Sequence, residues 1–294
     1  MPLFRRRDER PPSRAAQSRS SHLDDEDLDW RSFDSVAETY ARLSAPNLAV
    51  VAKDLVDLLE VAPGQHVLDV GTGTGVGARA AADATGQGGV AVGVDPSMGM
   101  LRVAAGGRGG PAYAAATSID LPFHEATFDR LMANFVIAFF PDYKTALFEL
   151  LRVLKPGGRL AVTWWGAGDN EDELRKTWRG LVEEFAEHEV LQDAQRRVIP
   201  WEERFSDPNV LKETLHEAGL RDIWTELREY RFTMSREDWL VGRESTVMGR
   251  FLRQMVGPEL WETFRSRARQ VFADRFPDPL NDFRDVVLAV GHKP

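Results

Sequence analysis

The sequence lacks cysteine altogether, since none of its 294 residues is Cys. Disulfides, thiolate zinc sites and thiol nucleophiles are therefore excluded, and the absence fits a reducing compartment, so we expect a cytoplasmic protein. Long apolar runs are missing as well. The longest, Leu131–Phe140, is interrupted by Asn134 and is well below the roughly 20 residues that cross a bilayer, so we expect no membrane partner.

Basic charge is scarce beyond the first residues. The formal net charge is −9, and residues 1–20 carry six Arg against one Asp and one Glu, which leaves −13 for the rest of the chain. Nucleic-acid binding depends on a basic surface, so we expect no nucleic-acid partner. Residues 1–27 are rich in Arg, Ser, Pro and acids and are expected to form a disordered tail, because they bury too little apolar surface.

Residues 28–294 are expected to form one α/β domain. Short apolar strands alternate with helical patterns between residues 66 and 165, which predicts a Rossmann-like, doubly wound parallel sheet. Two later segments, 223–232 and 283–291, alternate like half-exposed strands and predict an antiparallel last strand in a seven-stranded sheet. Helical segments at about 166–206 and 234–275 are rich in aromatic residues and are expected to form a lid over an apolar pocket.

A glycine-rich loop follows the first strand of this pattern. Gly71, Thr72, Gly73 and Gly75 stand between a strand and a helix, where bare backbone lets a ligand approach. The spacing also satisfies the dinucleotide pattern G-x-G-x-x-G/A, so a nicotinamide or flavin oxidoreductase is an alternative. Asp69 would repel a pyrophosphate but attract the ammonium and sulfonium of S-adenosylmethionine. Its other interpretation is a hydrogen bond to its own loop.

A second acid, Asp95, ends the second predicted strand. Its offset from the loop is close to that at which an acid accepts from the ribose hydroxyls of a bound nucleoside. The alternative is a helix N-cap before Pro96. Its place at the carboxyl end of a strand favours ligand binding.

Four stretches in this order resemble the class I S-adenosylmethionine-dependent methyltransferases, in particular the quinone-biosynthesis branch. They are Val67–Gly75, Asp95–Leu101, Leu121–Phe123 with Phe128–Asp129, and Leu154–Leu160. The resemblance implies S-adenosylmethionine as cofactor. It implies that Asp69 and the glycine loop hold the methionine part, Asp95 and Pro96 lie at the ribose, Met100 meets the adenine, and Tyr40 covers the methionine end. Where many relatives carry an acid for the adenine amino group this sequence has Thr117, and Ser118 and Ile119 are expected to serve through backbone groups.

The substrate is expected to be a small, hydrophobic or aromatic molecule that accepts a methyl group at carbon, nitrogen or oxygen. Trp164, Trp165 and Trp178 are the predicted pocket residues, although each aromatic is equally consistent with simple core packing. Asn134 and His124 are the candidate catalytic residues, with a structural hydrogen bond and a solvated surface position as their respective alternatives. No metal site is expected, and the sequence does not indicate an oligomeric state.

Two other functions remain open at this point. A protein on this scaffold can keep the cofactor yet catalyse non-methylating chemistry such as cyclisation, because fold does not fix function. A cofactor-sensing or interaction module is the non-enzymatic alternative.

Overall fold

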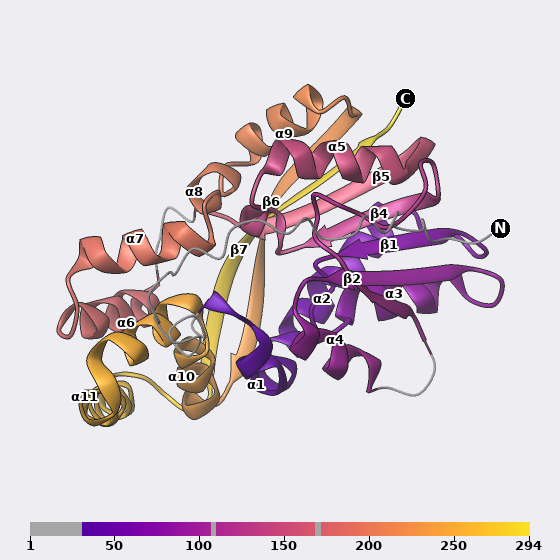
Figure 1. Cartoon of the computed structure of the whole chain (residues 1–294). Coiled ribbons are helices and arrows are strands. Elements are labelled where there is room, and N and C mark those ends of the chain that lie inside the picture. The colour runs from indigo at the N-terminus through magenta and orange to yellow at the C-terminus, as the bar shows by residue number, and fades with distance from the viewer. Residues whose placement is uncertain (1–30, 107–109, 168–171) are drawn as a thin grey trace, which may run out of the picture.

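The computed structural model describes residues 31–106, 110–167 and 172–294 (Figure 1). The predicted tail, residues 1–27, lies outside this part of the chain. Among the described residues the centre is a seven-stranded sheet in the order β3-β2-β1-β4-β5-β7-β6. Its strands are β1 (His66–Val70), β2 (Val90–Asp95), β3 (Ala112–Ala115), β4 (Phe128–Asn134), β5 (Leu154–Trp165), β6 (Arg221–Met234) and β7 (Leu280–His292).

The strand order reverses between β1 and β4, which both run parallel to each other. β7 is antiparallel to β5 on one side and to β6 on the other. The predicted doubly wound, mostly parallel sheet with an antiparallel last strand is therefore confirmed. In such sheets ligands bind outside the carboxyl ends of the strands where the order reverses, which here is the edge at the ends of β1 and β4.

Helices cover both faces of the sheet (Figure 1). α3 connects β1 to β2, and α5 connects β4 to β5 in the opposite direction across the sheet. Because such connections are right-handed, the two helices lie on opposite faces. α9 packs on β6 and β7. None of the described helices is both long and apolar enough to cross a membrane. In chain order these helices are η2 (Asp34–Val36), α1 (Ala37–Leu43), α2 (Ala45–Leu58), α3 (Val76–Thr85), α4 (Met98–Ala105), η3 (Ile137–Phe139), α5 (Tyr143–Val153), α6 (Glu173–Glu183), α7 (His188–Val198), α8 (Glu202–Phe205), α9 (Pro208–Glu217), α10 (Arg236–Glu244) and α11 (Val247–Arg275).

We call α6, α7, α10 and α11 the helical subdomain. These helices come from the two segments predicted as a lid, and they share an apolar core separate from that of the sheet. Three tryptophans stand in that core, Trp178, Trp239 and Trp261, around Phe264. α11 changes direction at Gly257, where φ is 76° just before Pro258. Most aromatics of these segments therefore form a second core, whereas Trp201 and Phe205 pack into the core of the sheet.

The last two strands are longer than the sequence predicts. β5 ends its pairing at Trp165 opposite Val286, but β6 and β7 stay paired as far as Met234 opposite Leu280. This two-stranded extension leaves the sheet and reaches the helical subdomain (Figure 1). It brings charged residues at the start of β7 to the space between the two parts.

Candidate active site

The loop between β1 and α3 presents backbone rather than side chains. Gly71, Gly73 and Gly75 have positive φ values of 71°, 53° and 86°, which glycine adopts without steric cost. A Cβ on Gly71 would lie 2.3 Å from Cγ2 of Val136, whereas a Cβ on Gly73 would meet no atom within 4 Å. The loop is packed tightly at Gly71 and faces open space at Gly73, where a ligand can approach the main chain.

Asp69 is buried behind this loop. Its Oδ2 accepts a hydrogen bond from Thr72 Oγ1 at 2.7 Å, while its equally buried Oδ1 has no partner among the described residues. Burial raises the pKa of Asp69 to about 6, and the Thr72 bond opposes the rise. The bond to Thr72 is the local contact that the sequence offered as one interpretation, and Oδ1 keeps capacity for a cationic ligand.

Asp95 joins the glycine loop to α4. Its Oδ2 accepts from the amide of Gly73 and its Oδ1 from the amide of Ser97, both at 2.9 Å. The side chain is 9% exposed, and burial raises its pKa. The N-cap of α4 is Ser97, whose hydroxyl accepts from Met100 N. The N-cap interpretation of Asp95 is therefore wrong, because Ser97, two residues closer to the helix, occupies that role.

Tyr40 reaches the same edge of the sheet from α1. Its ring meets Phe33 edge-on with centroids 6.2 Å apart. Burial and then the charge of Asp95 raise the pKa of the Tyr40 hydroxyl, which therefore stays protonated. The segment after β3 runs on the other side, where the amide of Ala116 donates to the Asp95 carbonyl at 3.3 Å. The remaining predicted cofactor contacts are exposed at Pro96, Thr117 and Ile119 and buried at Ser118 and Met100.

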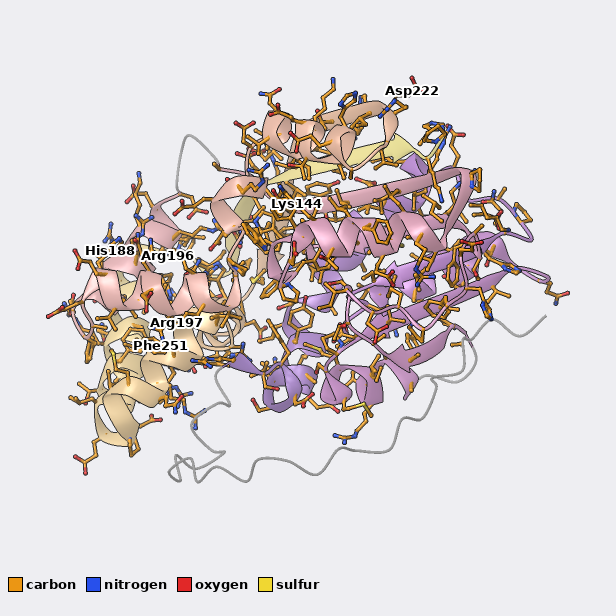
Figure 2. All side chains as sticks on the ribbon, turned by 45° about the horizontal axis from the view of Figure 1, so that its top comes forward. Lys144, His188, Arg196, Arg197, Asp222 and Phe251 are labelled. Atoms are coloured by element: carbon orange, nitrogen blue, oxygen red, sulfur yellow. The ribbon has the colours of Figure 1, made fainter. Side chains whose placement is uncertain are left out.

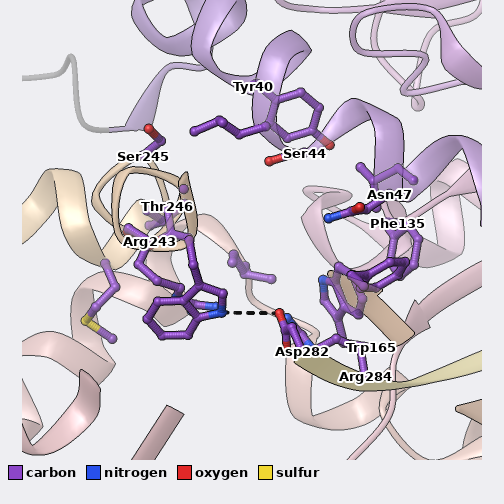
Figure 3. Close-up of a pocket in the computed structure, with 18 of the residues that line it drawn as sticks. Tyr40, Ser44, Asn47, Phe135, Trp165, Arg243, Ser245, Thr246, Asp282 and Arg284 are labelled. Carbon is purple, nitrogen blue, oxygen red and sulfur yellow. Dashed lines mark hydrogen bonds between the residues drawn. The ribbon is translucent and has the colours of Figure 1, made fainter. Parts of the chain in front are cut away.

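A pocket of about 290 Å³ lies between the sheet and the helical subdomain (Figure 3). Tyr40 lines it, so the pocket adjoins the edge where Asp95 stands. The residue after β4, Phe135, stacks on Trp165 with ring centroids 4.0 Å apart, and the next residue, Val136, contacts Gly71. The lining residues used below are Tyr40, Ser44, Asn47, Phe135, Trp164, Trp165, Glu202, Trp239, Arg243, Asp282 and Arg284.

The region that carries the loop and Asp95 has known relatives. The family model of the methyltransferase domain matches residues 68–162, from β1 into β5. This part of the chain is thus similar to the methyltransferase domain family. The resemblance predicted from the four ordered stretches is therefore confirmed. A second model, protein-L-isoaspartate (D-aspartate) O-methyltransferase, matches residues 23–106.

Curated relatives match the same class of domain over part of their length. Nocamycin O-methyltransferase of Saccharothrix syringae is 33% identical over 136 residues, which are 45% of this chain and 49% of that protein. Demethylmenaquinone methyltransferase of Renibacterium salmoninarum is 41% identical over 108 residues, 37% of this chain and 44% of that protein. The chain thus covers about half the length of the relatives it matches.

Solved structures show the same fold over most of the chain. The YcgJ protein of Bacillus subtilis aligns with a TM-score of 0.53 at 20% identity, covering 83% of this chain and 98% of that one. Phosphoethanolamine N-methyltransferase 2 of Haemonchus contortus, solved with S-adenosyl-L-methionine, aligns with a TM-score of 0.54 at 22% identity, covering 91% and 59%. At these identities the likeness shows the fold of the methyltransferase domain.

Neither of the two candidate catalytic residues lines the pocket. Asn134 accepts from Thr163 Oγ1 at 2.8 Å and donates to the Leu48 carbonyl at 3.4 Å, which is the structural arrangement that the sequence left open. The His124 side chain is exposed in a loop. A further histidine, His188, lies exposed at the start of α7 and contacts Glu183 (Figure 2).

The three predicted pocket tryptophans divide into two groups. Trp164 and Trp165 both line the pocket. Trp178 is 5% exposed and packs edge-on against Trp239 and Phe264 in the core of the helical subdomain. It lines a neighbouring hollow instead. Simple core packing, the alternative weighed for each aromatic, therefore accounts for Trp178.

Sequence reasoning missed the charged residues of the pocket. Arg284 and Asp282 sit on the inward face of β7, where Val286 and Leu288 continue the same face into the core. The alternation of a strand could have predicted this, because every second residue points to the same face, and residues 282 and 284 stand in line with 286 and 288. From charge alone, residues 282 and 284 would be expected to face solvent and Phe283 to face the core. The structure has the reverse, because Phe283 is 41% exposed.

Proposed function

We propose that this methyltransferase domain binds S-adenosylmethionine and transfers its methyl group to a small organic molecule in the adjoining pocket. One observation carries the proposal: Tyr40 lines the pocket and stands close enough to Asp95 for that charge to raise the pKa of its hydroxyl, so a ligand on the glycine loop borders the space where a second molecule fits. The relatives matched by sequence are named as methyltransferases, which supports methyl transfer over non-methylating chemistry.

The residues present fit this cofactor. Space in front of Gly73 is open, buried Oδ1 of Asp69 has no partner among the described residues, and Asp95 is an acid at the end of β2. We propose that Asp69 and the Gly71–Gly75 loop hold its cationic methionine end, that Asp95 and Pro96 meet the ribose, and that the adenine lies among Met100, Thr117, Ser118 and Ile119. When bound, the cofactor supplies an electrophilic methyl group on a good leaving group.

The protein's own contribution is then positioning and exclusion of water. Eight of the residues that line the pocket are aromatic, and one of them, Trp164, is only 2% exposed. Stacked Phe135 and Trp165 fix a flat surface beside the glycine loop. Roles for Asn134 and His124 stay predictions that their positions do not support. A small-molecule substrate, rather than nucleic acid, agrees with the acidic chain, and the lack of cysteine supports a cytoplasmic setting.

Titration calorimetry with S-adenosylmethionine and S-adenosylhomocysteine tests the proposal. Wild-type protein is expected to bind both saturably, and Asp95→Ala is expected to lose binding. Asp83→Ala is the matched control, because it removes an exposed acid from α3 without touching the loop. No binding to wild type, or equal loss in both variants, would remove the proposed cofactor site. Release of S-adenosylhomocysteine from a panel of small aromatic acceptors then tests methyl transfer itself.

A further inference from the structure

Two arginines line the pocket at the side away from Tyr40 (Figure 3). Arg284 comes from the extension of β7 and Arg243 from α10, so the helical subdomain and the sheet each contribute one. Neither guanidinium forms a hydrogen bond or an ion pair within the described ranges, and the buried Nε of Arg243 has no partner there. Both arginines are partly buried, and charged groups withdrawn from water usually have a partner, so this arrangement needs a reason.

Arg284 is held by stacking instead. Its guanidinium lies 3.8 Å from the centroid of the Trp165 ring, and Phe135 covers that ring at 4.0 Å. At these distances the guanidinium and the phenyl ring cannot both lie on the same face of the Trp165 indole, so they pack on its two opposite faces. A stacked guanidinium uses its flat face and leaves its N–H edge free for an in-plane acceptor. Arg243 similarly lies over Trp239, 5.6 Å from the ring centroid.

The nearby acids are already engaged. Asp282 accepts from Arg175 and, at 3.3 Å, from Nε1 of Trp239. Asp172 also pairs with Arg175. A third acid, Glu202, bonds to Gln195.

Three arginines, Arg175 and the two of the pocket, thus face three acids, but among the described residues only Arg175 forms ion pairs with them. The N–H groups of Arg243 and Arg284 are left without an acceptor there. Burial, followed by the charges of Arg175 and Arg243, lowers the pKa of Arg284 to about 9, which still leaves it charged at neutral pH. The pKa of Arg243 falls to about 10 from burial and Arg175. Burial raises the pKa of Glu202, against the opposing effects of its bond to Gln195 and of the charges of Arg284 and Arg243. An anion between the two guanidiniums would relieve this repulsion.

We infer that the substrate is an apolar, flat carboxylic acid whose carboxylate binds between Arg243 and Arg284 while its body lies along Trp164 and Trp165. The inference rests on the proposed function, since it places the other end of that molecule near Tyr40, beside the proposed cofactor. A cationic substrate is disfavoured because the acids of the pocket already have partners. The volume of about 290 Å³ accommodates a two-ring molecule.

Paired probes test the charge requirement directly. Biphenyl-4-carboxylate and the neutral, equally shaped biphenyl-4-carboxamide are titrated calorimetrically into wild-type protein saturated with S-adenosylhomocysteine. The carboxylate is expected to bind at least tenfold more tightly than the amide, as charge-assisted hydrogen bonds in a buried site do. The comparison uses unaltered protein, so it does not depend on any variant folding.

Variants then locate the effect. Arg243→Gln and Arg284→Gln are each expected to reduce the preference to threefold or less, and Arg284→Lys to keep only part of it, because lysine lacks the flat fork. Arg197→Gln is the control, since Arg197 is exposed on α7 and pairs with Asp193 (Figure 2). Circular dichroism and binding of S-adenosylhomocysteine verify that each variant is folded.

The outcomes separate the two claims. Failure of wild type to bind S-adenosylhomocysteine counts against the proposed function. Normal binding of S-adenosylhomocysteine, together with equal affinity for acid and amide or no binding of either, overturns the carboxylate site alone. An acid preference that survives both Gln substitutions also overturns it, because the anion would then bind elsewhere.

Discussion

At the scale of single residues, Gly71 and Gly73 share a left-handed backbone but differ in their surroundings. Gly71→Ala places a methyl group 2.3 Å from Val136, whereas the same change at Gly73 meets open space. We expect Gly71→Ala to lower the free energy of unfolding by about 2–4 kcal/mol, from backbone strain plus overpacking. Gly73→Ala is expected to cost only about 1 kcal/mol but to weaken cofactor binding at least tenfold, because its methyl group enters the space assigned to the cofactor.

Urea denaturation and calorimetry on the two variants check this contrast. Cofactor affinity that is unchanged in folded Gly73→Ala would mean that the open side of the loop is not the binding surface.

Asp69 predicts the pH dependence of cofactor binding. Its pKa of about 6 means that the carboxylate is largely protonated at pH 5 and ionised at pH 7.5. A cationic ligand favours the ionised carboxylate, so cofactor affinity rises as the pH increases through 6. Below pH 6, binding is accompanied by release of the Asp69 proton. We expect S-adenosylmethionine to bind about tenfold more weakly at pH 5 than at pH 7.5.

Calorimetry in buffers of different ionisation enthalpy measures both the affinity and the proton released. Asp69→Asn should bind more weakly at pH 7.5 and show a flatter profile. A profile of the same slope in this variant would assign the titration to another group, of which Asp95 is the nearest with a raised pKa.

At the scale of elements, the segment around Asp34 is hydrogen-bonded to the start of α4, a contact that we call the clasp. Oδ1 of Asp34 accepts from Ser97 Oγ and from Gly99 N, both at 2.6 Å. Gly99 makes this possible, because a Cβ there would lie 2.6 Å from the Asp34 Cα. The clasp determines where Phe33 and Tyr40 stand relative to Asp95.

We predict that Gly99→Ala separates this segment from α4. Hydrogen exchange of residues 33–43 should accelerate, and S-adenosylhomocysteine should bind several-fold more weakly because Tyr40 is displaced. Gly106→Ala is the control, since Gly106 caps the same helix at its other end in ordinary helical conformation. Unchanged exchange in Gly99→Ala would show that the segment is held by other contacts.

The helical subdomain gives a second prediction at this scale. Trp178 packs between Trp239 and Phe264, so Trp178→Ala should lower stability by about 3–5 kcal/mol through the cavity it leaves. Affinity for S-adenosylhomocysteine should stay within about twofold under conditions where the variant is folded, because Trp178 lies away from the glycine loop. Trp224→Ala, at a 40% exposed position on β6, is the matched control and should cost less than 1 kcal/mol.

At the scale of the whole molecule, β6 and β7 belong to both parts of the structure. They pair within the sheet and continue into the helical subdomain, where Leu280 joins its core. Neither part can unfold without disturbing these strands, so we predict one cooperative thermal transition. Far-UV circular dichroism and tryptophan fluorescence, to which Trp178, Trp239 and Trp261 of the helical subdomain contribute along with the tryptophans of the sheet, should show the same melting temperature. Two separate transitions would contradict the prediction.

Much of this architecture was predictable from the sequence. The order of strands from β1 to β5 and the glycine loop follow from apolar runs, turn residues and glycine spacing, all of which are local signals. Within the helical segment predicted at about 166–206, the boundaries were not predictable: one helix ends at Glu183, and a new helix begins at His188 after a turn. Helix ends depend on tertiary packing as well as on local pattern.

The pocket was less predictable because its chemistry is assembled from distant segments. Trp165, Arg243 and Arg284 come from three separate regions, and each alone fits an ordinary surface or core position. Asn134 was selected for its place after β4, yet its amide is occupied by Thr163 and Leu48 while the next residue, Phe135, turns into the pocket at a φ of 54°. A positive φ at a phenylalanine is not signalled by sequence.

The position of β7 sets an order of assembly during synthesis. The strand made last lies inside the sheet between β5 and β6 and supplies Arg284, so a ribosome that has completed residue 234 carries β6 without the neighbour it pairs with. The cofactor loop is encoded in the first third of the chain, but the substrate pocket closes only when the final strand emerges. The residues of the glycine loop are thus synthesised long before those of β7 that complete the pocket.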